Sequence, residues 1–236
     1  MMIIISLLLL ASLLPQLTFT ARVNVGIVNG TEAKPHSRPY MVSLQIDKKH
    51  VCGGFLISDE FVLTAAHCWK GYPEILTVMV GAHDLKNSKD SYRVEVKSYI
   101  PHQYCPFCSH WNDIMLLREG DVSGDTLCSV AGWGRLLTKG TLSSRLMEAN
   151  TTTINHEECQ RKWGSMYFQA SQMICAHGNG GSCLGDSGGP LVCGNTAVGV
   201  TSFVYIKGCN SPERPNVYTK ISAYLPWIHQ IIRNIE

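Results

Sequence analysis

Short segments of β-type composition recur along this chain of 236 residues, and turn residues separate them. The 21 glycines and 10 prolines interrupt the segments before any of them becomes long. Seven segments favour β-strands, at residues 40–46, 61–64, 76–80, 93–100, 129–131, 197–203 and 216–221. This spacing is typical of an all-β barrel or sandwich, and an apolar fraction of 45% supplies a sizeable core.

The last part of the chain follows a different period. Ile221, Leu225, Ile228 and Ile232 are spaced as on one face of an α-helix. Pro226 is compatible with the first turn of such a helix, where a backbone N–H has no helical partner. We therefore expect one terminal amphipathic helix lying on a β body.

The first 21 residues predict an exported protein. The apolar run from Ile3 to Leu14 is too short to span a bilayer, and small residues follow it. This pattern favours a cleaved signal peptide over residues 1–21, with a signal anchor that stays in place as the alternative. No second apolar run is long enough to cross a membrane, so we expect a secreted or granule-stored protein without a membrane partner.

The ten cysteines of an exported chain imply disulfide bonds. Two Asn-x-Thr sequons, at Asn29 and Asn150, predict N-glycosylation on the same export route. The net charge of +2 gives no indication of nucleic-acid binding.

A histidine, an aspartate and a serine occur in this chain order within three distinctive motifs, Thr64–Cys68, Asn112–Leu117 and Gly185–Pro190. A serine hydroxyl is a weak nucleophile unless a base accepts its proton, and His67 is the candidate base for Ser187. Asp113 is the candidate carboxylate that orients the imidazole and stabilises its charged form. Taken singly, the histidine motif is compatible with a core histidine, the aspartate motif with a cap, and the serine motif with a turn. Together, in this order and in an exported chain, they favour a nucleophilic site.

These motifs resemble those of chymotrypsin-type serine proteases, and the stretch Lys34–Tyr40 resembles the granzyme and mast-cell-protease branch. The resemblance implies an all-β, trypsin-like fold over residues 27–236, with two antiparallel Greek-key β-barrels packed together and a C-terminal helix. Barrel 1 would span about 27–118 and barrel 2 about 125–236. The implied activity is that of a serine endopeptidase without a metal or organic cofactor, in which the N–H groups of Gly185 and Ser187 stabilise the oxyanion.

The segment Ile27–Gly30 resembles the new N-terminus that proteolysis creates in the activated family. The resemblance implies a propeptide at residues 22–26 and an ion pair between the freed amino group of Ile27 and Asp186. Gly26 precedes the scissile bond, where a tryptic activator would need arginine or lysine. We therefore expect an aminopeptidase-like or otherwise non-tryptic activator.

In the family, the residue six positions before the nucleophile lies at the base of the specificity pocket, and here it is Gly181. Without an acidic side chain there, burying a substrate cation is unfavourable. The resemblance implies that substrate is bound by Gly181, Ser202, Phe203, Val204 and Asn216, with residues 202–204 pairing with its backbone. Val204 stands where many relatives have glycine, so the resemblance implies a narrower pocket. We expect cleavage after an uncharged, medium-sized residue; alternatively, Gly181 and Asn216 are turn residues that carry no information on specificity.

The resemblance also implies four disulfides, Cys52–Cys68, Cys128–Cys193, Cys159–Cys175 and Cys183–Cys209. Cys105 and Cys108 remain, and the family does not usually have both. A local disulfide between them, a redox or zinc half-site and an intermolecular bridge are the alternatives. An intermolecular bridge would give a disulfide-linked dimer, and the other implied partners are protein or peptide substrates and inhibitors such as serpins.

One segment departs from the family pattern. Asp113 and Cys128 are 15 residues apart, about half the usual separation. The missing residues normally form the crossing between the barrels, and small shifts between two halves of a shared site cost orders of magnitude in rate. A non-catalytic protease-like binding protein is therefore one alternative to an active enzyme. An inactive product of alternative splicing or of an incorrect gene model is the other.

Overall fold

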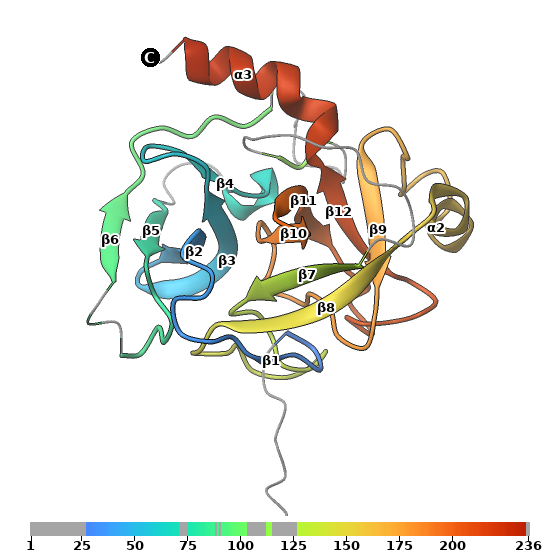
Figure 1. Ribbon diagram of the computed structural model, residues 1–236, viewed down its shortest axis with the longest axis horizontal. Helices are drawn as coiled ribbons and strands as arrows, with labels where there is room; N and C mark the ends of the chain where they lie inside the picture. Colours follow the sequence, from blue (N-terminus) through green and yellow to red (C-terminus); the bar gives the residue numbers. More distant parts are fainter. Residues whose placement is uncertain are drawn as a thin grey trace, which may run out of the picture.

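A computed structural model describes residues 27–70, 75–87, 89, 91–102, 112–114 and 127–234. Two antiparallel β-sheets make up the body of the molecule, and helix α3 lies across one end (Figure 1). The expected signal peptide and propeptide fall outside the described residues, and so do residues 115–126 of the shortened segment.

The first sheet contains five strands in the order β4-β3-β2-β5-β6. Their bounds are Val62–Leu63 (β4), Lys49–Leu56 (β3), Met41–Ile46 (β2), Thr77–Val80 (β5) and Tyr92–Glu95 (β6). Strands β2 and β3 form a hairpin whose turn residues, Asp47 and Lys48, have positive φ angles of 49° and 64°, as a type I′ turn requires. Successive residues of β2 enter two cores, because Val42 and Leu44 pack within this sheet whereas Met41 packs toward the second sheet.

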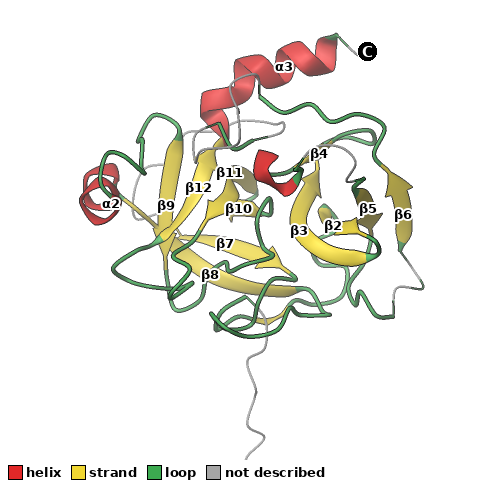
Figure 2. Ribbon diagram, turned by 180° about the vertical axis from the view of Figure 1, so that it is seen from behind, coloured by secondary structure: helices red, strands yellow, loops and turns green. Residues whose placement is uncertain are grey.

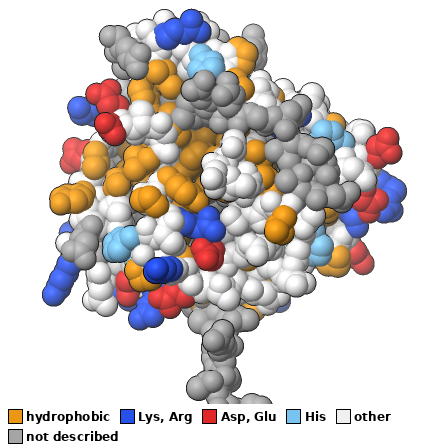
Figure 3. Space-filling model, viewed as in Figure 1, with side chains coloured by type: hydrophobic (Ala, Val, Ile, Leu, Met, Phe, Trp, Pro, Cys, Tyr) orange, Lys and Arg blue, Asp and Glu red, His pale blue; other side chains and the backbone are white. Residues whose placement is uncertain are grey.

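At β6 the apolar face of the first sheet reaches the surface. Val94 and Tyr92 lie opposite Val78 and Val80 in the strand register, so the four side chains share one face. Val78 is buried, whereas Val94 and Tyr92 are 50% and 77% exposed. Hydrophobic side chains accordingly gather on the half of the surface that covers the first sheet (Figure 3).

The second sheet contains seven strands in the order β1-β8-β7-β10-β11-β12-β9, and an additional pairing of β8 with β9 closes six of them into a barrel. The bounds are Thr31–Glu32 (β1), Met147–Ile154 (β8), Leu127–Gly132 (β7), Pro190–Cys193 (β10), Thr196–Phe203 (β11), Asn216–Lys220 (β12) and Met173–His177 (β9). Val130, Leu191 and Tyr218 are buried together in one core of this barrel. The all-β fold class is confirmed, with a closed barrel packed on a curled five-stranded sheet.

Helix α3 (Leu225–Arg233) confirms the predicted terminal helix and continues directly from the 3₁₀-helix η3 (Ile221–Tyr224). Pro226 lies in its first turn, as expected. Ile221 and Ile228 are completely buried and pack against residues of the first sheet. Because η3 follows β12 of the second sheet, this packing joins the two sheets.

Helix α2 (His156–Trp163) lies beside β9 at the edge of the barrel (Figure 2). Asn155 caps its N-terminus, because the side-chain oxygen accepts the N–H of Glu158 at 2.8 Å. The buried Cys159 of this helix forms a disulfide with Cys175 of β9.

Further contacts that do not pass through residues 115–126 hold the two sheets together. Met79 of the first sheet packs with Trp133 and Leu146, the residues that directly follow β7 and precede β8 of the second sheet. The carbonyl of His83 accepts the Leu146 N–H at 2.9 Å and the Trp133 Nε1–H at 3.1 Å. The relative placement of the sheets is therefore supported by packing and hydrogen bonds outside the shortened crossing.

The structure contains disulfides at the four pairs implied by the resemblance, Cys52–Cys68, Cys128–Cys193, Cys159–Cys175 and Cys183–Cys209. Cys105 and Cys108 lie outside the described residues. Of the helices in the described part of the chain, none has the length and apolar character needed to cross a membrane. Asn29 and Asn150 are both exposed and line one hollow of about 440 Å³; glycosylation at these sites stays a prediction.

Candidate active site

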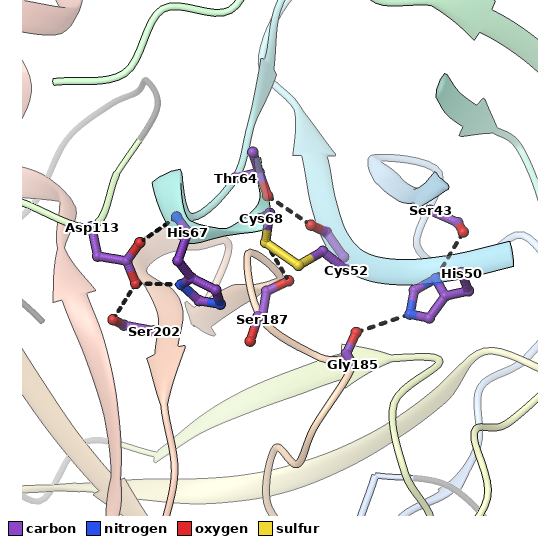
Figure 4. Close-up of a disulfide and its surroundings, with 11 residues drawn as sticks. Ser43, His50, Cys52, Thr64, His67, Cys68, Asp113, Gly185, Ser187 and Ser202 are labelled. Atoms are coloured by element: carbon purple, nitrogen blue, oxygen red, sulfur yellow. Dashed lines mark hydrogen bonds and ion pairs between the residues drawn. A yellow bond between two sulfur atoms is a disulfide. The ribbon is translucent and has the colours of Figure 1, made fainter. Parts of the chain in front are cut away.

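His67 lies in the short 3₁₀-helix η2 (Ala66–Cys68), and its side chain faces Asp113 (Figure 4). Nδ1 of His67 is 2.8 Å from Oδ2 of Asp113, and the backbone N–H of His67 donates to Oδ1 at 3.0 Å. The Cys52–Cys68 disulfide ties η2 to β3 of the first sheet. From the second sheet, the hydroxyl of Thr219 donates to the Asp113 carbonyl at 2.9 Å. Both carboxylate oxygens of Asp113 therefore contact His67. Contacts from both sheets fix the positions of these two residues.

The electrostatics of this pair favour a proton on His67. Burial raises the pKa of the Asp113 carboxyl, but the hydrogen bonds and charge of His67 outweigh burial and bring that pKa below its usual value. Burial likewise lowers the pKa of His67, and the adjacent carboxylate more than reverses this effect. The site therefore stabilises the imidazolium, which is the state a general base reaches after accepting a proton.

Ser202 provides a third donor to Asp113. Its hydroxyl is buried and lies 2.5 Å from Oδ2 of Asp113. The resemblance implied only a role of Ser202 in binding the substrate backbone. The structure adds that its side chain is directed to the carboxylate that holds His67 (Figure 4).

Ser187 lies in a turn of the second sheet that approaches the first sheet closely. Gly53 of β3 donates its N–H to the Ser187 carbonyl at 2.8 Å. Gly188 has a φ of 82°, and a side chain at this position would collide with the hydroxyl of Thr64. Glycine therefore permits both this backbone conformation and the close approach. Among the residues drawn in Figure 4, no hydrogen bond joins Ser187 to His67, and catalytic bonds of this kind often tighten only with substrate.

Two backbone N–H groups at this turn, those of Gly185 and Ser187, have no acceptor within the described residues. The Leu184 carbonyl accepts the Arg135 N–H at 2.8 Å, so the Gly185 N–H, on the opposite side of the same planar peptide, points away from Arg135. The Asp186 carbonyl accepts an N–H from within the turn at 3.0 Å, which orients the Ser187 N–H in the same manner. Two oriented, free donors beside a serine hydroxyl form a candidate oxyanion hole.

His50 of β3 also holds this turn, although no sequence motif indicated it. Its Nε2 lies 2.9 Å from the Gly185 carbonyl oxygen and its Nδ1 lies 2.8 Å from the Ser43 hydroxyl. Burial lowers the pKa of His50 to about 4, although the bond to the Gly185 carbonyl raises it in part. The ring is therefore neutral at pH 7. Nε2–H donates to Gly185, Nδ1 accepts from Ser43, and the first sheet orients the turn that contains the candidate oxyanion hole.

Asp186 is a buried carboxylate without a cation. It is 1% exposed, and its two oxygens accept the backbone N–H groups of Gly134 at 2.7 Å and Cys183 at 2.8 Å. Burial raises the pKa of Asp186 to about 7, and these two hydrogen bonds offset only part of the rise. In the part of the chain that the structure describes, no lysine, arginine or histidine forms an ion pair with it.

The segment that resembles an activated N-terminus lies next to this turn. Val28 forms a β-bridge with Gly181, whose N–H donates to the Val28 carbonyl at 3.1 Å. Ile27 is completely buried and has a φ of 24°, an unfavourable value for a β-branched residue. Val28 packs with Cys183, which bonds to Asp186, so the segment is close to the unpaired carboxylate.

The predicted base of the pocket is polar and uncharged. A side chain at Gly181 would come within 2.9 Å of the carboxamides of Asn210 and Asn216. Asn216 is 2% exposed and donates from Nδ2 to the Ser182 carbonyl at 2.9 Å. The structure thus brings the predicted residues Gly181 and Asn216 together, and it adds Asn210, which no motif indicated.

The other predicted substrate-binding residues lie on the strand that leads away from Ser202. Phe203 ends β11, and its ring contacts Trp163 edge-on with ring centres 5.1 Å apart. Val204 follows and packs against the cluster formed by Val28 and the Cys183–Cys209 disulfide. This strand therefore lies beside Gly181 and Asn216, the residues predicted to form the base of the pocket.

One group of three side chains in the described residues places metal-ligand atoms close together, Cys52, His67 and Cys68. The two cysteines form a disulfide, whereas metals bind the thiolate form of cysteine. This group is therefore not a metal-ligand set.

The comparisons with known proteins agree with this geometry. The family model described as Trypsin matches residues 27–121 and 118–228. Granzyme B(G,H) of Mus musculus is 38% identical over 249 residues, covering 94% of this chain and 98% of its own. Cathepsin G of Homo sapiens is 36% identical over 258 residues, covering 98% of this chain and 95% of its own.

A solved structure of neuropsin, a serine protease expressed in the limbic system of mouse brain, has a TM-score of 0.77 to this chain. It is 31% identical, and the match covers 87% of this chain and 100% of the neuropsin chain. The chain therefore belongs to the trypsin family and is a serine-type endopeptidase.

Proposed function

We propose that this endopeptidase is secreted or stored in granules as a precursor, and that it cleaves peptide bonds after uncharged side chains by means of Ser187, His67 and Asp113. The arrangement around Ser187 carries the proposal. A histidine held by a buried carboxylate and two unoccupied backbone donors converge on the turn that presents this hydroxyl.

Each group has a part in the reaction. Ser187 Oγ attacks the substrate carbonyl as its proton passes to Nε2 of His67, and Asp113 stabilises the imidazolium. The Gly185 and Ser187 N–H groups bind the oxyanion. The C–N bond then breaks as His67 returns the proton to the leaving amine. Water, activated by His67 in the same way, hydrolyses the acyl-enzyme and releases the acid product and free Ser187.

Activation follows from the missing counter-ion of Asp186. Cleavage between Gly26 and Ile27 creates an ammonium group at a segment already packed beside the Asp186 turn. An ion pair in this buried position is costly to break, because either charge alone would remain desolvated. Asp186 immediately precedes Ser187, so the pair would fix the turn that carries the oxyanion donors. A glycine before the scissile bond favours an aminopeptidase-like or otherwise non-tryptic activator.

The alternative of a non-catalytic or inactive product depended on the shortened crossing after Asp113. The contacts that position the site do not require that crossing. Gly53 and His50 of the first sheet bond the turn that contains Ser187, and Ser202 and Thr219 of the second sheet bond Asp113. These bonds favour an active enzyme.

Protein or peptide substrates are the partners of this activity, and the family resemblance adds inhibitors such as serpins. A disulfide-linked dimer through Cys105 or Cys108 would appear as a species of twice the mass in non-reducing electrophoresis. A purely monomeric band would remove the dimer from the proposal.

A fluorophosphonate probe tests the activity directly. We expect covalent labelling of the protein that begins at Ile27 and none of the Ser187→Ala variant. Mass spectrometry of the labelled peptide identifies the modified residue. A folded, processed protein that resists the probe would contradict the proposal and favour a binding role.

A further inference from the structure

Strand β6 is the longest edge strand of the two sheets. The first sheet ends in β6 on one side and in β4 on the other, and β1 lies at the edge of the second sheet (Figure 1). Strands β4 and β1 have two residues each, whereas β6 has four. The outer backbone groups of β6 meet no other strand within the described residues, so this edge offers N–H and C=O groups to another chain.

Several features that block edge pairing in natural proteins are missing from β6. Such features include a proline, a β-bulge and a charged side chain on the inward face of the strand. The segment Tyr92–Glu95 contains no proline, and its register with β5 is unbroken. Its charged residues, Arg93 and Glu95, lie on the face opposite to that of Tyr92 and Val94. All four residues are exposed, so the strand is accessible along its length.

The symmetry of an antiparallel pair limits how two copies of β6 can meet. Hydrogen-bonded and non-hydrogen-bonded pairs alternate along such a ladder, so a two-fold axis must place one residue opposite its own copy. Arg93 and Val94 are the two central residues of β6. An axis at Arg93 would oppose two like charges, which is destabilising. An axis at Val94 opposes two apolar side chains instead.

The axis at Val94 also makes the charges of the two copies complementary. It places Arg93 of each copy opposite Glu95 of the other, so two cross-strand ion pairs form. Arg93 donates one N–H to the Thr77 hydroxyl at 2.9 Å, and its guanidinium has further N–H groups to donate. Glu95 forms no ion pair with another described residue. Both charges are therefore available for this pairing.

The same arrangement continues the apolar face of the first sheet from one copy to the other. Val94 would face its own copy, and Tyr92 would face Val96, which packs against the core of the first sheet. Val94 and Tyr92 are 50% and 77% exposed in the single chain. Their half of the surface is the one on which hydrophobic side chains gather (Figure 3). One register thus satisfies the charges, the backbone groups and the apolar side chains of β6.

We infer that β6 is an interface between two copies of this chain, which pair as antiparallel strands about Val94. The pairing joins the first sheets of the two copies into one continuous sheet. It uses none of the proposed catalytic residues, and it needs no disulfide between the copies.

Charge reversal tests this interface by sedimentation velocity of the secreted protein, with Ser187→Ala present throughout to prevent self-digestion. We expect a dimer whose Kd rises by about 10-fold or more in Arg93→Glu and in Glu95→Arg, because each change opposes like charges at two places. The double variant Arg93→Glu/Glu95→Arg restores both ion pairs with their signs exchanged. Its Kd should return to within about 3-fold of the unaltered value.

Lys139→Glu, at an exposed position between β7 and β8, is the matched control for net charge and should leave Kd unchanged. Near-UV circular dichroism verifies that each variant is folded. In SDS without reductant this dimer should separate, whereas a dimer linked through Cys105 or Cys108 should not. A protein that stays monomeric at every soluble concentration, a double variant as weak as the single ones, or a dimer that resists SDS completely would overturn the inference.

Discussion

Asp113 and Asp186 are both almost completely buried, yet their surroundings shift their pKa values in opposite directions. Asp113 faces His67 and accepts additional hydrogen bonds, so its pKa lies below the usual value despite burial. Asp186 accepts two backbone N–H groups and meets no cation among the described residues, so burial raises its pKa to about 7. The same side chain is therefore ionised at one site and half-protonated near neutral pH at the other.

The difference separates the part of the active site that is complete once the chain has folded from the part that is not. The pair of His67 and Asp113 is formed by residues of the folded chain and needs no further change. The Asp186 site lacks a positive charge, and the proposed cleavage before Ile27 would supply one. A protease that is assembled but not yet switched on would show this combination.

Disrupting the pair of His67 and Asp113 should have the largest effect on catalysis. In Asp113→Asn, His67 loses the acceptor that fixes its tautomer and the charge that stabilises its imidazolium. We expect kcat to fall by about 10⁴-fold.

In the unaltered enzyme, kcat/KM should increase as pH rises, and the midpoint of this increase should lie above pH 6.5. The reason is that His67 must be neutral to act as a base, and Asp113 raises the pKa of His67. Steady-state kinetics from pH 5 to 9 measures both; an Asp113→Asn enzyme within 10-fold of the wild type would contradict the role of Asp113.

The unpaired site should be visible in the pH dependence of stability. The folded precursor keeps the Asp186 proton up to about pH 7, whereas the unfolded chain releases it near 3.8. The folded state then binds more protons in this window, so stability falls as pH rises. We expect the precursor to lose about 4 kcal/mol between pH 4 and pH 8 relative to the form that begins at Ile27.

Urea unfolding of both forms as Ser187→Ala variants measures this difference. His67 contributes to both forms, so the comparison removes its titration and leaves that of Asp186 and of the Ile27 amino group that would pair with it. Parallel pH profiles for the two forms would exclude a new ion pair at Asp186.

Substituting Asp186 should lower the activity of the processed enzyme, because only that form has the freed Ile27 amino group. In Asp186→Asn, the freed amino group of Ile27 has no charged partner, and the oxyanion donors of the adjacent turn lose their support. We expect kcat/KM of the processed enzyme to fall by about 10²-fold and the pH dependence of precursor stability to flatten. Asp59→Asn, at an exposed position, is the matched control. Equal activity of the Asp186→Asn and control enzymes would count against the activation mechanism.

The smallest effect is expected at Ser202. Ser202→Ala removes one donor from Asp113 while leaving the strand backbone in place. If Ser202 is a positioning residue for the pair, kcat should fall by about 10-fold at unchanged KM. A rise in KM at constant kcat would instead assign Ser202 to substrate binding alone.

Strands and helices could be predicted from the sequence where apolar residues recur with a clear period and turn residues mark the ends of the segment. The predicted segments at 40–46 and 197–203 closely match β2 and β11. Strand β3 contains Gly53 and Gly54, and residues 148–150 of β8 are Glu, Ala and Asn, which are depleted in strands, so neither segment has the composition that marks a strand throughout. Helix α2 is short and polar, and its signal was the capping pattern of Asn155 and Glu158 rather than an apolar face.

The site was predictable through its motifs and not through its supporting contacts. His67, Asp113 and Ser187 each lie in a distinctive local sequence. His50 and Asn210 do not, because their positions result from the approach of segments far apart in the chain. Likewise, only the three-dimensional arrangement reveals that Oδ1 of Asn216 is buried without a hydrogen-bond partner among the described residues.

Labelling rates test whether a free amino group at Ile27 completes the Asp186 site and switches on Ser187. The precursor, the protein that begins at Ile27 and the same protein with its Ile27 amino group acetylated should be treated with the fluorophosphonate in parallel. We expect rapid labelling of the second protein and labelling slower by about 100-fold or more in the other two. Equal rates in all three would contradict this expectation.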